Sequence, residues 1–465
     1  MSLPKAFDND ESYFKSAVEF LENYSWIYSE ANTSCIKALD RMPKVFKDYF
    51  LSASNESLNT FPFVHVPLED CPNELQDLRQ QIAKMIPEAH TPTAPRKVPS
   101  KCSNQNRKIG RKKLHEIEQL AANIHEHCAK AETQLLVDLG SGLGYLSEAL
   151  LQLNDNYLIL GLEADEQRVI SAQQRCEKLM PQKALNSISY RQEFVSADAQ
   201  CRDRIEAHTS ELAQSHGLSP ELTTITMAII GLHACADLSV SAMRLFLTMP
   251  QVRSLLIMPC CYHKLALREG IDDLVSSPFV NFPLSSALNK ATANLAVCCF
   301  NRPFLRLACQ ETSSRWRKDS AAHAEHGHQM YWRALANAVS DDPDELVKVQ
   351  PKSQQTTHDF NGLCLRYQLH SRLTAQLLSW RPSHETRFRQ INERYSEGRG
   401  SHLAEALCCL QTSIQKLCEN LLLYDRLCYL REAAAEQQLR VEVRYEQLFD
   451  EQVSPRCQVL IAKKL

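Results

Sequence analysis

Short apolar runs alternate with amphipathic stretches between residues 113 and 263. Five runs have the length and the turn-residue borders of buried strands, at 135–137, 157–163, 188–195, 223–233 and 252–258. Between them apolar residues recur at helical spacing, for example at Leu146, Leu150 and Leu153. Strand and helix in strict alternation predict right-handed crossovers, and therefore a doubly wound parallel sheet of the α/β class.

A different pattern follows the fifth run. Residues 264–400 are rich in Ser, Asn, Arg and His, and we expect a large, mainly helical insertion there. Within the segment 401–465, the spacing predicts one long helix over 403–432 and two strands over 439–449 and 456–462. We expect this C-terminal helix and strand pair to complete the sheet that the core begins.

The segment before the core divides into a mostly helical region, 1–85, and a linker, 86–112. Four prolines exclude a regular helix or a central strand from the linker: Pro87, Pro92, Pro95 and Pro99. Eight basic residues and no acidic one occur in the basic segment 96–113: Arg96, Lys97, Lys101, Arg107, Lys108, Arg111, Lys112 and Lys113. This is either a solvated linker or a contact for RNA phosphates or an acidic protein surface. In the second case Lys112 and Lys113 are candidate substrate-binding residues.

Composition limits the class of protein. A chain of 465 residues with 44% hydrophobic and 23% charged residues fits a globular protein of several domains, or one core with large insertions. The net charge of −3 gives no global attraction to nucleic acid, so any such surface is local. The chain has neither a secretory leader pattern nor an apolar run of membrane-spanning length, so we expect a soluble intracellular protein, cytoplasmic or nuclear. The 18 scattered cysteines then favour reduced, buried thiols over a disulfide framework.

A glycine-rich turn links the first strand to the next helix. Gly140, Gly142 and Gly144 follow Asp138 in the sequence VDLGSGLGY. A strand that turns sharply into a helix leaves backbone N–H groups facing the turn, where they suit a polar or anionic ligand. The dinucleotide fingerprint requires its third glycine at Tyr145, so a dinucleotide oxidoreductase is the less favoured alternative.

S-adenosylmethionine has no phosphate and fits this turn better. We expect Asp138 to bind its ammonium group, and the main chain at the glycines to approach its methionyl tail. Glu163, at the end of the second strand, is the candidate for the ribose hydroxyls, and Asp198, after the third strand, for the adenine amino group. The structural alternatives are an N-cap for Asp198 and a solvated strand end for Glu163.

Two further clusters follow the fourth and fifth strands and would open onto the same crevice. His233, Asp237 and His263 are candidates for proton transfer or for orienting the methyl acceptor, although Asp237 could equally cap the next helix. Cys260, Cys261 and Tyr262 are candidates for acceptor binding. Cys235, Cys260, Cys261, His233 and His263 could instead ligate zinc. Adjacent cysteines are a poor tetrahedral spacing, so we expect no metal.

These clusters also carry a family resemblance, which runs from about residue 105 to the C-terminus. The segments RKKLHEI (111–117), GLHACADL (231–238) and PCCYH (259–263), with the glycine loop, resemble the methyltransferase-like 25 group, which includes proteins named for a ribosomal RNA adenine dimethylase domain. The last two segments are also similar to those of the eukaryotic tRNA 2′-O-methyltransferases, whose N-terminal zinc fingers this chain lacks. Ala236 stands where a glycine is commoner in the group.

The resemblance implies a Rossmann-like, seven-stranded class I methyltransferase sheet that binds S-adenosyl-L-methionine. It does not imply adenine N6 chemistry, because GLHA stands where the dimethylases have an Asn-Leu/Ile-Pro-Tyr tetrapeptide. We therefore expect an S-adenosylmethionine-dependent methyltransferase with an RNA or protein acceptor. The alternative is a catalytically inactive protein that keeps the fold as a binding or scaffold module.

Overall fold

The computed structural model describes residues 1–68, 70–87, 109–180, 186–218, 226–269, 278–293, 295, 299–316, 320–340, 342–350, 357–395 and 399–465. Most of the basic segment, including Arg96, Lys97, Lys101, Arg107 and Lys108, lies outside these residues. Among the described helices, none is both long and apolar enough to cross a bilayer.

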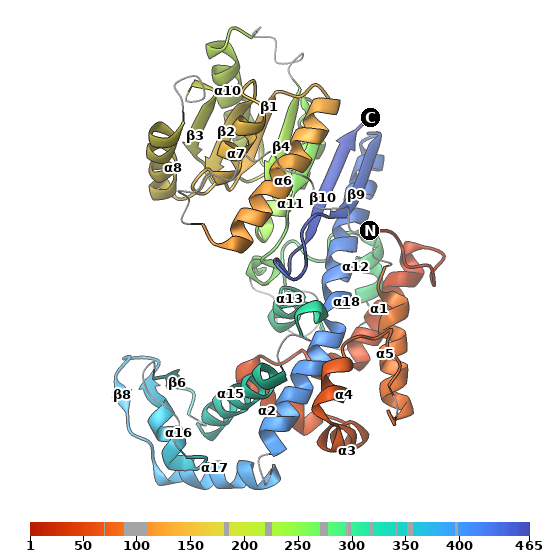
Figure 1. Ribbon diagram of the computed structural model, residues 1–465, viewed down its shortest axis with the longest axis vertical. Helices are drawn as coiled ribbons and strands as arrows, with labels where there is room; N and C mark the ends of the chain where they lie inside the picture. Colours follow the sequence, from red (N-terminus) through yellow and green to blue (C-terminus); the bar gives the residue numbers. More distant parts are fainter. Residues whose placement is uncertain are drawn as a thin grey trace.

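Seven strands form the main sheet, in the order β3-β2-β1-β4-β5-β10-β9 (Figure 1). They are β1 (Leu135–Leu139), β2 (Leu158–Glu163), β3 (Ile188–Gln192), β4 (Met227–Gly231), β5 (Val252–Ile257), β9 (Val441–Gln447) and β10 (Gln458–Lys464). The first five are parallel, and β10 pairs antiparallel with β5 and β9. This arrangement confirms the predicted seven-stranded Rossmann-like sheet.

Helices cover both faces of the sheet. They are α6 (Arg111–Lys130), α7 (Tyr145–Leu153), α8 (Glu166–Leu179), α10 (Ala199–Ser215) and α11 (Asp237–Thr248). Apolar residues of α6 and α7 form one buried cluster with Leu136 and Ile159. Residues of α10 and α11 form another with Leu135 and Leu160. Alternate residues of each central strand therefore face opposite layers, as a buried parallel sheet requires.

The long helix α18 (Arg399–Glu436) connects the sheet to the helical remainder. Its 38 residues span about 57 Å at 1.5 Å per residue. It packs against β9 at one end and against α15 (Ser320–Val339) and α3 (Lys44–Ser52) further along. Figure 1 shows it running down from the sheet into these helices. The other helices of this part are α1 (Asp10–Asn23), α2 (Cys35–Arg41), α4 (Asn55–Thr60), α5 (Asn73–Met85), α12 (Ser286–Thr292), α13 (Arg302–Ala308) and α14 (Ser313–Trp316).

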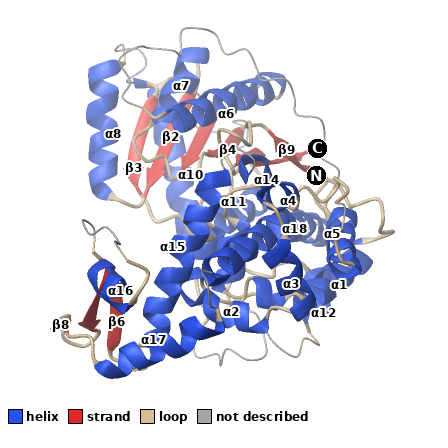
Figure 2. Ribbon diagram, turned by 60° about the horizontal axis from the view of Figure 1, so that its bottom comes forward, coloured by secondary structure: helices blue, strands red, loops and turns tan. Residues whose placement is uncertain are grey.

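The segment 264–400 contains a feature that its composition did not predict. A three-stranded antiparallel sheet lies apart from the main one, in the order β6 (Glu345–Val349), β7 (Tyr367–Ser371) and β8 (Leu377–Leu378) (Figure 2). The helices α16 (Phe360–Arg366) and α17 (Pro382–Arg394) flank it. Burial alternates along β7, and this period of two was the local signal for a strand.

Candidate functional site

The glycine loop is held by its own hydrogen bonds. Gly140, Gly142 and Gly144 all have positive φ, between 57° and 75°. The N–H groups of Gly140 and Ser141 donate to the Leu162 carbonyl at 2.8 and 3.1 Å, and the Gly142 N–H donates to Glu163 Oε2 at 3.0 Å. The end of β2 already accepts from these three N–H groups, and the contact of the glycine loop with a cofactor stays a prediction.

Glu163 closes the turn between β1 and β2. It is 8% exposed, and its Oε1 accepts from the Asp165 N–H at 3.2 Å. Each carboxylate oxygen has two lone pairs. Glu163 can therefore hold the loop and still accept from two hydroxyls of a ligand.

Asp138 lies below the loop and is 1% exposed. Its Oδ2 accepts from the Ser147 hydroxyl of α7 at 2.9 Å. Burial raises the pKa of Asp138 to about 7, although the Ser147 hydrogen bond opposes this. The carboxyl group thus ties β1 to α7, and its role toward an ammonium group stays a prediction.

Tyr145 and Tyr190 determine the shape of the loop's far side. A Cβ on Gly144 or Gly161 would overlap the Tyr190 side chain, so both positions require glycine. The Tyr145 ring lies beneath two cations, with Lys113 Nζ 4.1 Å and Arg175 Cζ 4.0 Å from its centroid. Burial and the Arg175 charge lower the pKa of Lys113.

Both lysines proposed for substrate binding lie in the first turn of α6, which begins two residues before the helix start expected at Lys113. Lys112 Nζ lies 3.8 Å from Glu116 Oε1, and its side chain is 52% exposed. Lys113 is engaged with Tyr145, so Lys112 is the more available of the two.

Asp198 caps α10: its Oδ1 accepts from the Cys201 N–H at 2.8 Å and its Oδ2 from the Ser196 hydroxyl at 2.5 Å. The structure thus gives Asp198 the capping role, and its contact with adenine stays a prediction.

His233, after β4, is oriented by a residue that the sequence analysis missed. Its Nε2–H donates to Glu116 Oε2 at 3.1 Å, and the Ser454 hydroxyl donates to Glu116 Oε1 at 2.6 Å. Glu116 is 1% exposed. Burial raises its pKa, but the hydrogen bonds from His233 and Ser454 outweigh that effect and hold the pKa below its usual range. A buried carboxylate therefore fixes the ring of the one candidate base on this turn.

Asp237 fastens the turn after β4 to the segment that follows β5. Its Oδ2 accepts from the Ala266 N–H at 2.9 Å and its Oδ1 from Asn281 Nδ2 at 2.8 Å. Because both carboxylate oxygens have structural partners, Asp237 is better suited to positioning the two turns than to transferring a proton. Ala236, immediately before it, has φ +48° and ψ −125°, a conformation that favours glycine.

Three thiols meet between the turns after β4 and β5. Cys235 Sγ lies 3.0 Å from Cys260 Sγ, which lies 3.7 Å from Cys261 Sγ. Hydrogen bonds from the Cys235 and Cys260 thiols lower the pKa of Cys261, which Lys264 and His263 lower further. Of the three thiols, Cys261 is the one whose pKa is lowered, whereas the pKa values of Cys235 and Cys260 are raised. The sequence analysis named these three cysteines with His233 and His263 as a possible but less favoured zinc set, and the structure brings the three sulfur atoms together.

Residues of the segment 264–400 hold the turn around Cys261 in place. The Tyr262 N–H donates to Cys309 Sγ at 3.2 Å, the Cys309 thiol donates to the Cys260 carbonyl at 3.2 Å, and Arg302 donates to the His263 carbonyl. Tyr262 itself is 1% exposed, so the acceptor-contact role predicted for its side chain is wrong in this conformation. Burial lowers the pKa of His263, whose Nδ1 has no hydrogen-bond partner among the described residues.

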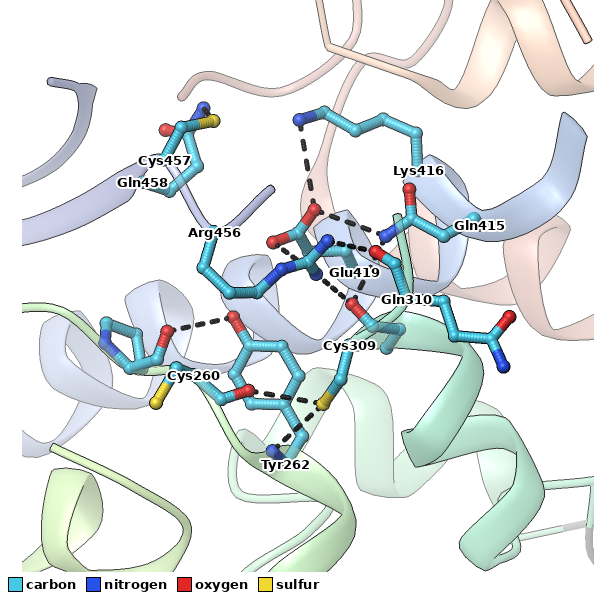
Figure 3. A network of polar contacts seen from close by, with 12 residues as sticks. Cys260, Tyr262, Cys309, Gln310, Gln415, Lys416, Glu419, Arg456, Cys457 and Gln458 are labelled. Atoms are coloured by element: carbon cyan, nitrogen blue, oxygen red, sulfur yellow. Dashed lines mark hydrogen bonds and ion pairs between the residues drawn. The ribbon is translucent and has the colours of Figure 1, made fainter. Parts of the chain in front are cut away.

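Next to Cys260 and Tyr262, a buried ion pair joins α18 to the residues just before β10 (Figure 3). Arg456 Nη1 lies 2.9 Å from Glu419 Oε1, with side chains 7% and 1% exposed. The same guanidinium donates to the carbonyls of Ala308 and Gln310, at the end of α13. A cation at a helix C-terminus is favourable, and here it fixes the end of α13, which Cys309 follows.

A family model described as a methyltransferase domain matches residues 112–268, which include the glycine loop and both acceptor-side turns. Residues 112–268 are thus similar to a methyltransferase domain. The Mus musculus protein named "Probable methyltransferase-like protein 25" is 26% identical to the chain over 275 residues. This match confirms the resemblance to the methyltransferase-like 25 group. It covers 58% of the chain but only 40% of the relative's length.

Solved structures that are similar to the chain include the methyltransferase domain of bacterial CtHen1, which is 13% identical with a TM-score of 0.22; the match covers 30% of this chain and 65% of that one. Another is the plantazolicin methyltransferase BpumL in complex with SAH, at 8% identity and a TM-score of 0.21, covering 69% of this chain and 88% of that one.

Glu116, Cys309 and Ser454 are the site residues that sequence reasoning missed. Only Glu116 had a local signal, since it is a charged residue on the same helix face as Leu120 and Ile124. Cys309 and Ser454 stand in the segments LACQ (307–310) and SPR (454–456), which also resemble the methyltransferase-like 25 group, but nothing in those segments shows that they reach the site from other elements.

Proposed function

We propose that the chain is an S-adenosylmethionine-dependent methyltransferase whose methyl acceptor binds at the carboxyl ends of β4 and β5. The observation that carries this proposal is Glu163, a nearly buried carboxylate at the end of β2 that also braces the glycine loop after β1. Ligands of open α/β sheets bind at the carboxyl ends of the strands, where the order reverses. In this sheet the order reverses between β1 and β4.

The residues present fit that cofactor. Glu163 keeps lone pairs for two ribose hydroxyls, and Asp198 lies at the start of α10 for the adenine amino group. A Cβ on Gly142 would meet no atom nearer than 3.9 Å, so the main chain there is open to close approach. The cofactor, when bound, supplies an electrophilic methyl group.

On the acceptor side, His233 is the group that would remove a proton. Glu116 accepts from His233 Nε2–H, which leaves Nδ1 as the atom that takes the acceptor's proton, and the buried carboxylate stabilises the resulting imidazolium. Methyl transfer is an in-line displacement, so positioning of the acceptor supplies most of the acceleration. Asp237, through Ala266 and Asn281, keeps the two turns in fixed relation.

The acceptor class rests on charge. The basic segment 96–113 precedes and begins α6 in the sequence, and Glu116 of that helix meets His233, which supports an RNA or an acidic protein as acceptor. Incubation with labelled cofactor and fractionated cell RNA or protein distinguishes the two. For an RNA acceptor, Lys112→Ala should reduce the salt dependence of binding by about one phosphate contact.

Calorimetric titration with S-adenosylmethionine and S-adenosylhomocysteine tests the cofactor. Loss of a hydrogen bond to a charged group costs about 1.5–3 kcal/mol, so Glu163→Gln should weaken binding by about tenfold to a hundredfold. Glu166→Gln, on the exposed first turn of α8, is the matched control and should bind as the wild type does. Absence of heat with both compounds would overturn the proposal and leave the binding-module alternative. Unchanged affinity in Glu163→Gln would mean that the cofactor lies elsewhere.

A further inference from the structure

We propose that Cys235, Cys260 and Cys261 bind one zinc ion at the acceptor side of the sheet. The three residues come from two turns, after β4 and after β5, and their sulfur atoms all lie within 4.8 Å of one another. Of the described residues, no other three potential ligand atoms gather so closely. This site stands whether or not the chain binds S-adenosylmethionine.

The distances between the sulfur atoms suit zinc. Zinc–thiolate bonds of about 2.3 Å in a tetrahedron place two sulfur atoms about 3.8 Å apart. The Cys260–Cys261 separation of 3.7 Å has this value, and the 3.0 Å between Cys235 and Cys260 needs to open by less than 1 Å. Cys235 and Cys261 are partly exposed, so small rotations of their side chains can supply that change. Adjacent cysteines alone would be poor ligands, but a third thiol from the next strand turns them into three corners of a tetrahedron.

Both turns are held in place without the metal, as a binding site requires. The Leu238 N–H donates to the Cys235 carbonyl at 3.1 Å and closes the first turn. Cys309 bridges the Cys260 carbonyl and the Tyr262 N–H in the second (Figure 3). Lys264 places positive charge near Cys261, which favours the net negative charge of a zinc ion bound by three thiolates.

The fourth coordination position is open in this proposal. His263 is near, but its ring nitrogens are not among the mutually close ligand atoms. Three protein ligands with one open position are typical of zinc sites that bind a water molecule or a substrate. The open position would therefore be available to an acceptor group with an oxygen, nitrogen or sulfur atom.

Metal analysis of the full chain, purified under reducing conditions, tests the site. We expect one zinc per chain, and a thiolate-to-metal charge-transfer band when cobalt(II) replaces the zinc. Cys235→Ser and Cys261→Ser change partly exposed side chains and should lose the metal while circular dichroism stays unchanged. Cys176→Ser, a half-buried thiol of α8 outside the cluster, should retain it, and so should His263→Ala.

Several results would overturn the proposal. One is a reduced protein that contains no zinc after incubation with zinc chloride and desalting. Another is a zinc content that Cys235→Ser and Cys261→Ser leave unchanged. A Cys235–Cys260 disulfide in place of the metal, seen by peptide mass spectrometry, would assign the short sulfur contact to redox chemistry instead. Loss of zinc in His263→Ala would contradict the open fourth position.

Discussion

The carboxyl ends of β1 and β2 differ from those of β4 and β5 in how their turns are held. At the first pair, Glu163 and the Leu162 carbonyl accept from three successive N–H groups of the glycine loop, all within thirty residues of chain. At the second pair, the supports come from far along the chain: Glu116 for His233, and Cys309 for the Cys260 turn. The first site is shaped by local sequence, whereas the second depends on the helices and strands around it.

We expect the largest effect from a variant that removes a distant support of the second site. Glu419→Ala leaves Arg456 charged and buried without its partner, which should lower the free energy of unfolding by about 3–5 kcal/mol. Urea denaturation measures the change. Glu436→Ala, at the exposed end of the same helix, should change it by less than about 0.5 kcal/mol. Similar values for the two variants would show that the ion pair does not support the acceptor side.

A second prediction concerns the rigidity of the glycine loop. Gly144→Ala combines a left-handed backbone with an overlap of the new Cβ and Tyr190, and should cost about 3 kcal/mol. Gly217→Ala has a similar φ of +70° but no neighbouring atom within 4 Å, so it should lose only about 1 kcal/mol in the same denaturation experiment. If the free energy of unfolding falls equally in both variants, Tyr190 does not constrain the loop.

A third prediction uses the buried carboxyl under that loop. The pKa of Asp138 is about 7 in the folded protein and near 4 in the unfolded chain, so the folded state binds more protons between these values. This group therefore stabilises the fold at acidic pH and loses that effect as pH rises toward 7. Relative to the wild type, Asp138→Asn should gain about 2 kcal/mol in free energy of unfolding from pH 5 to pH 7. Asp203→Asn, on the exposed face of α10, should show no such pH-dependent gain.

The smallest effect tests the strain in the turn after β4. Ala236→Gly removes a Cβ from a backbone with φ +48° and should raise the free energy of unfolding by about 1 kcal/mol. Ala207→Gly, in the exposed middle of α10, should lower it by about 1 kcal/mol. A destabilised Ala236→Gly variant would mean that the turn stores no strain.

The same contrast explains what could be predicted from sequence. The strands and the glycine loop depend on periods of two and 3.6 residues and on glycine torsions, which are local properties. The pairing of Glu116 with His233 spans 117 positions, and that of Cys235 with Cys260 spans 25. Such pairings depend on how neighbouring strands and α6 align in space. The sequence therefore indicated His233, Cys235 and Cys260 as candidates, but neither Glu116 as the partner of His233 nor the direct contact between Cys235 and Cys260. The small sheet around β7 was missed because its segment was interpreted by composition.

The antiparallel pairing of β10 with β5 bears on how this protein can be dissected. Leu255, Leu256 and Ile257 of β5 pair with Ala462, Ile461 and Leu460 of β10. A recombinant fragment limited to residues 112–268 would therefore present an apolar strand with unpaired N–H and C=O groups along one edge. Such a fragment should aggregate when expressed alone, whereas a shortened protein that keeps α18, β9 and β10 retains the cover for that edge.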